Sequence, residues 1–362
     1  MDMTDLARVL TAASDRCRVE QACAHRDWLV YGAGRTGRKW AGALAESGRR
    51  VHGFIDRSVT DAHGIPVFTL EACPDPLKHS CAVLLGLHNP GVDVAAVRRQ
   101  LLAAGYQDVW LLQDLVDAWP ALEHFWLAPA AESLAYSADI EAAYKVLADE
   151  ESRRLMIALL DQRLNGNPDA LPPPETQTHY LPHGLPRPSS PVRYVDCGAY
   201  TGDTIQSFLR NGLAFEEIAA FEPDPAHYPR LVRAIESLRA LVFPCGAWDE
   251  MTQLRFSSDD SASHIDDAGE IIVQTVALDQ ALPNFAPTLI KMDIEGAEGR
   301  ALLGARRTIE SHRPQLAIST YHKPRDLWEL MLLVHRWDLG YRFHLRTHCH
   351  NGFETVLYGY AT

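Results

Sequence analysis

The chain has 362 residues, with 47 Asp and Glu against 34 Lys and Arg, and therefore a formal net charge of −13. At about 150 residues per domain this length predicts two domains. A composition of 47% hydrophobic and 22% charged residues excludes global disorder and collagen-like repeats. The acidic balance argues against a protein that binds nucleic acid by neutralising many phosphates, while a local site for a small anion stays open.

Short β-type runs alternate with helical runs in the first part of the chain. We expect strands over 28–32, 49–56, 81–87 and 108–112, and helices over 38–48 and 94–105. Such alternation predicts a parallel sheet with helices on its faces. Residues 1–125 are therefore expected to form a small Rossmann-like nucleotide-binding domain.

A glycine-rich turn follows the first expected strand. Its glycines are Gly32, Gly34 and Gly37, and Asp56 ends the next strand. This is the dinucleotide-binding fingerprint in its required strand–turn–helix context. The fingerprint leaves open whether the domain binds NAD or is a degenerate domain retained for docking or dimerisation.

The middle of the chain has a different texture. Residues 126–190 are expected to form a helical connector and a proline-rich linker. Helical spacing over 126–168 predicts one buried stripe, made by Ile140, Tyr144, Leu147, Leu155, Leu159 and Leu164. Eight prolines between 168 and 191 predict an extended, irregular segment, because proline removes a backbone donor and disfavours helix before it.

Alternation resumes over residues 191–362, which predict a second α/β domain. Strands are expected over 193–200, 218–223, 241–248, 288–293 and 315–322, and helices over 203–211, 225–239, 297–311 and 324–338. A β-rich insertion at 253–278 and two late strands, 341–346 and 354–360, complete the pattern. The expected fold class is α/β with two Rossmann-like doubly wound sheets, the second with an antiparallel end.

The strongest chemical signal is the strand–turn–helix segment VDCGAYTGDT at 195–204. Gly198 and Gly202 permit a tight turn and a close ligand approach, and the new helix offers free N–H groups to a carboxylate or phosphate. Glu222, at the tip of the next strand, is placed to accept both ribose hydroxyls of a nucleoside. Because the spacing is GxxxG, a mononucleoside with a small charged tail fits better than a dinucleotide, and S-adenosylmethionine has that shape. The alternative is an ordinary turn with a solvated acid.

Acidic residues follow the strand at 288–293. Asp293 or Glu295 could accept a proton from an alcohol or bind a divalent cation through hard oxygen ligands. Glu298 is better explained as an acid at a helix start. His322 ends the following strand and could act as a general base.

The histidines near the end of the chain invite a metal interpretation. Their spacing fits no common zinc pattern, and alternate residues of a strand point to opposite faces. These residues are His344, His348, Cys349 and His350. We expect His348 to contact substrate.

The quoted motifs together resemble the FkbM-type methyltransferases. The resemblance covers about Ala148 to the C-terminus and rests on VDCGAYTGDT, FEPDP, GAW, LIKMDIEGAE with LLGA, the STYH strand end with DLW, and ETVLY. It implies a class I S-adenosylmethionine-dependent fold that O-methylates a hydroxyl of a sugar or natural product.

The resemblance also implies roles for individual residues. The methionine part of the cofactor would be surrounded by Asp196, Gly198, Tyr200, Gly202 and Asp203. Glu222 would bind the ribose, and Ala247 and Trp248 would lie by the adenine. Asp293, Glu295 and His322 would face the acceptor, with His322 or Asp293 removing its proton. The proline-rich lead-in departs from the pattern, with His179-Tyr180-Leu181 where relatives often have an aromatic pair.

A second resemblance concerns the N-terminal part. The segments YGAGRTGRKW, VHGFIDRS and GIPVF are similar to the small Rossmann domain that precedes sugar-nucleotide acyltransferases. That resemblance implies nucleotide-sugar binding at Gly32, Gly34, Gly37 and Asp56, with Arg35 or Arg38 near the phosphate.

We therefore expect an S-adenosylmethionine-dependent O-methyltransferase acting on a sugar, nucleotide-sugar, glycan or natural-product precursor. The alternatives are a non-catalytic nucleotide-binding or scaffold protein, and an NAD-dependent oxidoreductase acting through the N-terminal fingerprint. The expected partner is a small acceptor rather than nucleic acid, a divalent cation is a further cofactor candidate, and a homo-oligomer is left open. Seven scattered cysteines, no signal peptide and no apolar span predict a cytoplasmic protein without an integral membrane segment.

Overall fold

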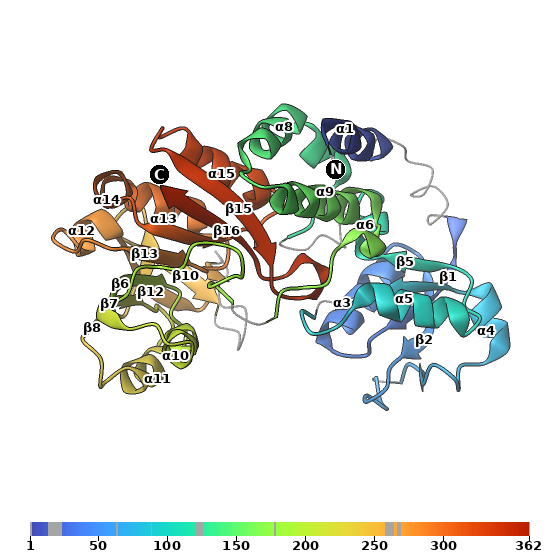
Figure 1. Cartoon of the computed structure of the whole chain (residues 1–362). Coiled ribbons are helices and arrows are strands. Elements are labelled where there is room, and N and C mark those ends of the chain that lie inside the picture. Colours follow the sequence, from blue (N-terminus) through green and yellow to red (C-terminus); the bar gives the residue numbers. More distant parts are fainter. Residues whose placement is uncertain are drawn as a thin grey trace. The chain divides into compact units, whose positions relative to one another are not determined.

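The computed structural model describes residues 2–13, 24–62, 64–87, 89–119, 126–176, 179–257, 264–265 and 269–361 (Figure 1). Two compact units make up the fold. One consists of Met1–Glu141, Arg153–Pro174 and Cys349–Phe353, and the other of Ala142–Ser152, Glu175–His348 and Glu354–Thr362. These units do not follow a single cut in the chain, and the predicted domains 1–125, 126–190 and 191–362 remain predictions.

The first unit contains a five-stranded parallel sheet. Its strands lie in the order β3-β2-β1-β4-β5, with β1 at Asp27–Tyr31, β2 at Arg50–Ile55, β3 at Val67–Phe68, β4 at Ala82–Leu85 and β5 at Val109–Leu111. The helices of its N-terminal part are α1 (Met3–Ala12), α3 (Arg35–Glu46), α4 (Asp75–Ser80), α5 (Val94–Ala103) and α6 (Leu112–Leu115). Alternating strands and helices have thus formed the predicted Rossmann-like sheet.

The connector folds as separate helices. They are α7 (Ala130–Leu134), α8 (Ser137–Val146), α9 (Glu150–Asn165) and the 3₁₀ turn η2 (Pro168–Ala170). All six residues of the predicted stripe are buried, as expected, but they are divided between α8 and α9, with Leu147 in the break between the two helices. Helix α8 ends before Leu147, which forms an isolated β-bridge with Phe343. Helix α9 then begins after Asp149, whose side chain accepts a hydrogen bond from the backbone N–H of Ser152 (2.7 Å).

The second unit is built on a seven-stranded sheet with the order β15-β16-β14-β13-β6-β7-β8. The strands are β6 (Val192–Cys197), β7 (Phe215–Phe221), β8 (Ala240–Phe243), β13 (Leu289–Met292), β14 (Gln315–Ser319), β15 (Tyr341–Thr347) and β16 (Thr355–Ala361). β16 is antiparallel to both β14 and β15, and the other pairs are parallel. This confirms the predicted doubly wound sheet with an antiparallel end, and it brings the carboxyl ends of β6, β7, β13 and β14 to one edge.

The remaining elements of the second unit surround that sheet. Its helices are α10 (Asp203–Arg210), α11 (Tyr228–Ala234), α12 (Leu278–Ala281), α13 (Glu298–Gly304), α14 (Arg306–His312) and α15 (Asp326–His335), while the 3₁₀ turn η3 (His350–Gly352) belongs to the first unit. The predicted helix over 297–311 is therefore two helices that meet at Ala305. A small sheet of order β11-β10-β12-β9 contains β9 (Gly246–Trp248), β10 (Thr252–Ser257), β11 (His264–Ile265) and β12 (Ile271–Ala277), as the β-rich insertion predicts.

Two further expectations bear on the setting of the protein. Within the described ranges, no helix has both the length and the apolar character needed to cross a bilayer. Five cysteines fall within those ranges and all are free, while Cys17 and Cys23 lie outside the described residues.

A glycine at position 37 is required by the close packing of α3 on the turn after β1. A Cβ built on Gly37 would lie 1.8 Å from the carbonyl oxygen of Gly32, whereas one built on Gly42, in the same helix, would meet no atom within 4 Å. We expect Gly37→Ala to lower the free energy of unfolding by about 1–3 kcal/mol or more. Gly42→Ala should raise it by about 0.5–1 kcal/mol, because glycine is a poor helix former.

Thermal denaturation followed by circular dichroism measures both changes. Because both variants add one methyl group to the same helix, a common effect of the added methyl cancels in the comparison. Equal melting temperatures for the two variants would contradict the close contact between Gly37 and the turn.

Candidate functional site

The turn after β6 can be built only with glycine at position 198. Gly198 has φ +79°, and a Cβ there would lie 2.0 Å from the carbonyl oxygen of Asp293. The backbone N–H groups of Gly198 and Ala199 both donate to the carbonyl of Phe221, each at 3.0 Å. The turn is thereby packed between the ends of β7 and β13, and a side chain at its first position would separate these elements.

Helix α10 begins directly after this turn without a side-chain cap. Its N-cap residue is Gly202, with φ +83°, which has no side chain that could cap the first N–H groups of the helix. The first-turn N–H groups and the helix dipole favour a negative group at this point. Tyr200, also at positive φ (49°), is 37% exposed, and its ring lies 4.3 Å from that of His227.

Glu222 closes the same site from the end of β7. Its carboxylate accepts hydrogen bonds from the backbone N–H of Tyr200 (2.8 Å) and of Asp224 (2.9 Å). The side chain is buried, and burial raises its pKa to about 7 even though these hydrogen bonds oppose the shift. Each carboxylate oxygen has a second lone pair, so Glu222 can still accept hydroxyl groups from a ligand.

A buried ion pair supports the turn from below. Lys291, in β13, donates from Nζ to the carbonyl of Gly198 (2.6 Å) and lies 3.1 Å from Oδ1 of Asp196. Burial raises the pKa of Asp196 to about 6. Burial alone would lower the pKa of Lys291, but the carboxylate of Asp196 raises it, and we conclude that the pair is ionised.

The structure therefore places Asp196 inside the fold, facing Lys291. Sequence reasoning assigned no role to Lys291, although a lysine within the apolar strand LIKM is itself a signal, because a buried lysine is normally paired.

The adenine-side candidates lie in β9, beside Glu222. A Cβ built on Gly246 would lie 3.9 Å from Cγ of Pro223, the residue that follows Glu222. Ala247 is buried, and the guanidinium carbon of Arg300 lies 5.1 Å from the centroid of the Trp248 ring. Ala247 and Trp248 thus belong to the small sheet, and β9 approaches the end of β7 at Pro223.

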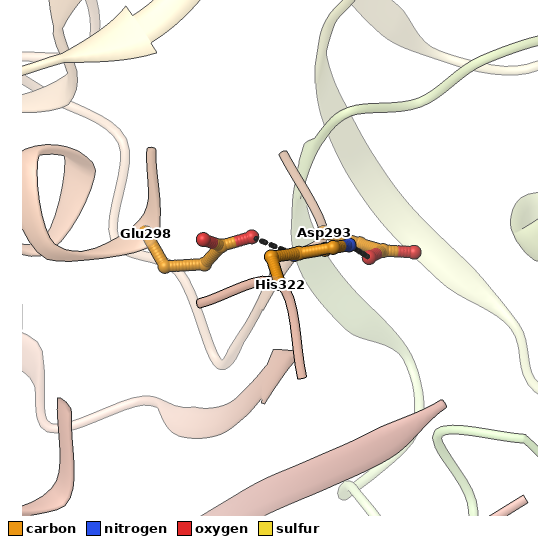
Figure 2. Close-up of side chains that lie close together, drawn as sticks. All are labelled: Asp293, Glu298 and His322. Atoms are coloured by element: carbon orange, nitrogen blue, oxygen red, sulfur yellow. Dashed lines mark hydrogen bonds and ion pairs between the residues drawn. The ribbon is translucent and has the colours of Figure 1, made fainter. Parts of the chain in front are cut away.

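The acceptor-side candidates meet at the ends of β13 and β14; Figure 2 shows two of them, Asp293 and His322, together with Glu298. His322 is buried between carboxylates: its Nδ1 lies 2.8 Å from Oε1 of Glu298, and its Nε2 lies 3.5 Å from Oδ1 of Asp293. Nε2 is also 3.5 Å from Oε2 of Glu295, a residue with φ +54°. Three acids that the sequence scatters over six positions therefore surround one imidazole.

These neighbours set the protonation of the ring. Burial would lower the pKa of His322, but the carboxylates of Glu298, Glu295 and Asp293 raise it to about 10. Burial would likewise raise the pKa of Asp293, but Lys291 and His322 lower it to about 2. In the absence of other cations, the ring is therefore positively charged at neutral pH.

Glu298 has more than the helix-start role that the sequence favours. Its Oε1 accepts the backbone N–H of Ile294 at 2.9 Å, which stabilises the turn before α13, and the same oxygen binds His322. The sequence around Glu298 indicated only a helix start. Its partner His322 follows β14, so the pairing could not be seen from spacing along the chain.

Aromatic and acidic side chains cover Asp293. Tyr180 donates its hydroxyl to Oδ2 of Asp293 at 2.8 Å, and its ring stacks on His179 with centroids 3.8 Å apart. The ring of His348 lies 4.8 Å from that of His179, so His348 reaches this cluster as a substrate contact would require. Glu354 accepts the Tyr321 hydroxyl at 3.0 Å and was not among the predicted site residues.

The other late histidines do not join a metal cluster. His344 binds Asp149 through Nδ1 at 2.7 Å. Among the residues that the structure describes, one group of three potential ligands has its atoms within 4.8 Å of one another, namely Asp293, Glu298 and His322.

The N-terminal fingerprint adopts the geometry that its sequence predicts. Gly32 has φ +95°, and Gly34 is the N-cap of α3 without a side-chain hydrogen bond. Asp56 accepts the backbone N–H of Ala33 at 2.8 Å, the same kind of contact that Glu222 makes with the β6 turn. Burial would raise the pKa of Asp56, but backbone hydrogen bonds lower it.

Comparisons with known proteins agree with this architecture. Residues 196–343 match the family model of the methyltransferase FkbM domain. The crystal structure of a methyltransferase FkbM from Methylobacillus flagellatus has a TM-score of 0.81 and 23% identity, with 99% of this chain and 98% of that chain covered. At this identity the match shows a common fold over both units.

A second structure is much less similar. A TehB-like SAM-dependent methyltransferase from Corynebacterium glutamicum has a TM-score of 0.27 and 12% identity, covering 49% of this chain and 82% of that chain. No curated protein matches the chain.

Replacing Lys291 tests its support of the turn. Lys291→Met keeps most of the side-chain volume but leaves the Asp196 carboxylate buried without its partner, so we expect the free energy of unfolding to fall by about 3–5 kcal/mol. The double variant Asp196→Asn/Lys291→Met should recover part of that loss, because no unpaired charge remains buried. Urea denaturation measures both, and a Lys291→Met protein within about 1 kcal/mol of the parent would refute the supporting role.

Proposed function

We propose that this protein transfers a methyl group from S-adenosylmethionine to a hydroxyl of a small acceptor, because residues 196–343 match the family model of the methyltransferase FkbM domain. The acceptor class that we propose is a sugar, nucleotide-sugar or glycan or natural-product precursor. The observation that carries the proposal is Glu222, a buried acid held against the β6 turn, with both oxygens able to accept further hydrogen bonds.

The cofactor proposal follows from what surrounds this turn. Glu222 would accept the two ribose hydroxyls, and Ala247 and Trp248 would flank the adenine. The uncapped start of α10, at Gly202 and Asp203, suits the carboxylate of the methionine part, and the backbone around Gly198 allows close approach. Tyr200 is exposed beside it, while Asp196 would act through the turn that it supports.

The acceptor is proposed to bind next to Asp293, at the ends of β13 and β14. Methyl transfer from a sulfonium needs in-line positioning and removal of one proton, because the methyl carbon is already activated. Asp293, Glu295 and His322 are the polar groups at this edge, and Tyr180 and His348 would complete the walls of the acceptor site. Hydroxyls suit this set, because they can donate to carboxylates and accept from the ring.

The first unit is proposed to bind a nucleotide through Gly32, Gly34, Gly37 and Asp56. Support comes from the positive φ of Gly32 and from the contact between Asp56 and Ala33. Thermal-shift titrations with NAD and with UDP-sugars distinguish the oxidoreductase alternative from nucleotide-sugar binding, since a ligand of the folded state raises the melting temperature.

Cofactor affinity should depend on pH through Glu222. The pKa of this carboxyl is raised to about 7, so the group is protonated at pH 6, and it can then no longer accept two hydroxyls at once. We expect the dissociation constant for S-adenosylmethionine to fall about tenfold between pH 6 and pH 8, as one proton is lost. Because the folded pKa lies above the unfolded value, this group's contribution to stability without ligand is present below about pH 4.5 and lost as the pH rises through 7.

Isothermal titration calorimetry at several pH values measures the change in affinity. Glu222→Gln is the matched control, because any pH dependence that comes from the cofactor's own amino group persists in it. A dissociation constant with the same pH dependence in both proteins would rule out Glu222 as the ribose acceptor.

Turnover should depend on the acceptor-side residues. We expect Asp293→Asn and His322→Gln each to reduce kcat about 10²- to 10⁴-fold, while S-adenosylmethionine affinity stays within about threefold of the parent value. Transfer of radiolabelled methyl to a panel of UDP-sugars and monosaccharides is the assay, with the half-exposed Glu329→Gln as a carboxylate control. Full turnover in both variants would exclude these residues from the reaction.

A further inference from the structure

A tyrosine orients each of two carboxylates at the acceptor edge. Tyr180 donates its hydroxyl to Oδ2 of Asp293 at 2.8 Å, and Tyr321 donates its hydroxyl to Oε1 of Glu354 at 3.0 Å. The other oxygen of each carboxylate, Oδ1 of Asp293 and Oε2 of Glu354, is buried and has no hydrogen-bond partner among the described residues. Because a buried acceptor without a partner costs free energy, each of these oxygens is suited to a donor that a ligand brings.

An imidazole lies beside each of these two oxygens. Nε2 of His322 is 3.5 Å from Oδ1 of Asp293, as Figure 2 shows, and Nε2 of His179 is 3.2 Å from Oε2 of Glu354. Neither nitrogen makes a hydrogen bond within the described part of the chain, so the two groups of each pair are close but not aligned to bond. Asp293 with His322 is called the first pair below, and Glu354 with His179 the second pair.

The two pairs are neighbours, because adjacent residues of the chain serve different pairs. His179 of the second pair stacks on Tyr180, which binds the carboxylate of the first pair, with ring centroids 3.8 Å apart. His322 of the first pair has its ring 4.1 Å from that of Tyr321, which binds the carboxylate of the second pair. One small molecule can therefore reach both pairs at once.

The surroundings of the second pair fix its geometry and leave it accessible. Glu354 has φ +52°, a strained conformation for a residue with a side chain, and such strain is retained where a side chain must point in one direction. His348, whose ring lies 4.8 Å from that of His179, already uses both nitrogens, with the Glu175 carbonyl at 2.9 Å and the Tyr358 hydroxyl at 2.8 Å. The side chains of His179 and Glu354 are 34% and 23% exposed, so a ligand can approach them.

The chemistry of the second pair selects a hydroxyl. Burial lowers the pKa of His179 to about 3, so its ring is neutral and carries one N–H. Burial, together with the carboxylate of Asp293, raises the pKa of Glu354 to about 7. An ammonium group has only donors and a phosphate offers mainly acceptors, so each would leave one member of the pair without a partner. A hydroxyl can donate to the carboxylate and accept from the ring.

We propose that Glu354 and His179 bind a second hydroxyl of the acceptor, so that the acceptor is a diol whose neighbouring hydroxyls occupy the two pairs. The hydroxyl at the first pair is the one proposed above to be methylated, and the hydroxyl at the second pair is bound without reacting. A sugar ring with hydroxyls on adjacent carbons has this form, whereas a simple alcohol or phenol does not. Only the choice of the methylated hydroxyl rests on the proposed function, and binding of the diol does not.

Diol binding is measured on the full chain without S-adenosylmethionine. The probes are the methyl α-pyranosides of D-glucose, D-galactose and D-mannose, which present different arrangements of neighbouring hydroxyls. ¹⁵N NMR of histidine-labelled protein observes the two imidazoles, and His179→Phe and His322→Gln assign their signals. We expect at least one of the three sugars to shift the ¹⁵N signals of both rings. Removing either of the two neighbouring hydroxyls from that sugar should weaken binding about 10- to 100-fold.

A double-mutant cycle between chain and sugar locates the second hydroxyl. Glu354→Gln should weaken binding of the intact sugar about 10- to 100-fold, because the acceptor loses its charge. In this variant, removal of the hydroxyl at the second pair should cost less than about threefold, because both changes delete the same contact. The exposed Glu236→Gln is the matched carboxylate control and should bind the sugar as the parent does.

A second variant keeps the test independent of the folding of Glu354→Gln. His179→Phe retains a ring that can stack on Tyr180 but removes the nitrogen, and it should show the same loss of discrimination against the deoxy sugar. The exposed His183→Phe, in the same segment, should leave binding unchanged. Circular dichroism confirms that each variant is folded.

Three results would overturn the proposal: no shift of both imidazoles by any of the three sugars at high millimolar concentration, parent affinity in the folded variants of Glu354 and His179, or an equal deoxygenation penalty in these variants and the parent. A protein that binds the diol at both rings but transfers no methyl group would support this inference and contradict the proposed function. Methyl transfer that is indifferent to the second hydroxyl would do the reverse.

Discussion

The buried contact between Lys291 and the β6 turn is the interaction on which the second unit's site depends. One ammonium group holds the Asp196 carboxylate and the Gly198 carbonyl at once, so β13 and the first turn of the sheet are fixed against each other. The same strand continues two residues later into Asp293, which faces His322. A displacement of Lys291 would therefore move the β6 turn and the end of β13 together, and this explains why a charge is retained inside an otherwise apolar strand.

Around that contact, each polar side chain of the candidate site is oriented by a hydrogen bond with a neighbouring group. Glu222 is held by the backbone of Tyr200 and Asp224, Asp293 by Tyr180, and His322 by Glu298. Glu222 keeps a second lone pair on each oxygen, whereas Asp293 Oδ1 and His322 Nε2 have no hydrogen-bond partner among the described residues. Such pre-organisation reduces the ordering that must accompany ligand binding, which is where a transferase that needs mainly correct positioning gains most.

Much of this could be predicted from the sequence because the relevant signals are local. Glycines at turns, strand–helix alternation and acids directly after strands specify the two doubly wound sheets and place Glu222, Asp293 and His322 at strand ends. Lys291, Tyr321 and Glu354 were missed because their importance comes from partners in other elements, which spacing along the chain does not encode. For the connector, periodicity identified the buried residues correctly but did not predict that the chain leaves the helix at Leu147 and starts a second helix after Asp149.

Asp56 accepts a backbone N–H of the glycine turn after β1, and Glu222 accepts one of the glycine turn after β6. The central claim is that S-adenosylmethionine binds at the turn after β6. A crystal structure of the full chain with S-adenosylmethionine tests this most directly. The account predicts the ribose at Glu222, the methionine carboxylate near the start of α10 and the methyl group directed toward Asp293. Cofactor bound instead at Gly32 and Asp56, with the β6 turn empty, would contradict it.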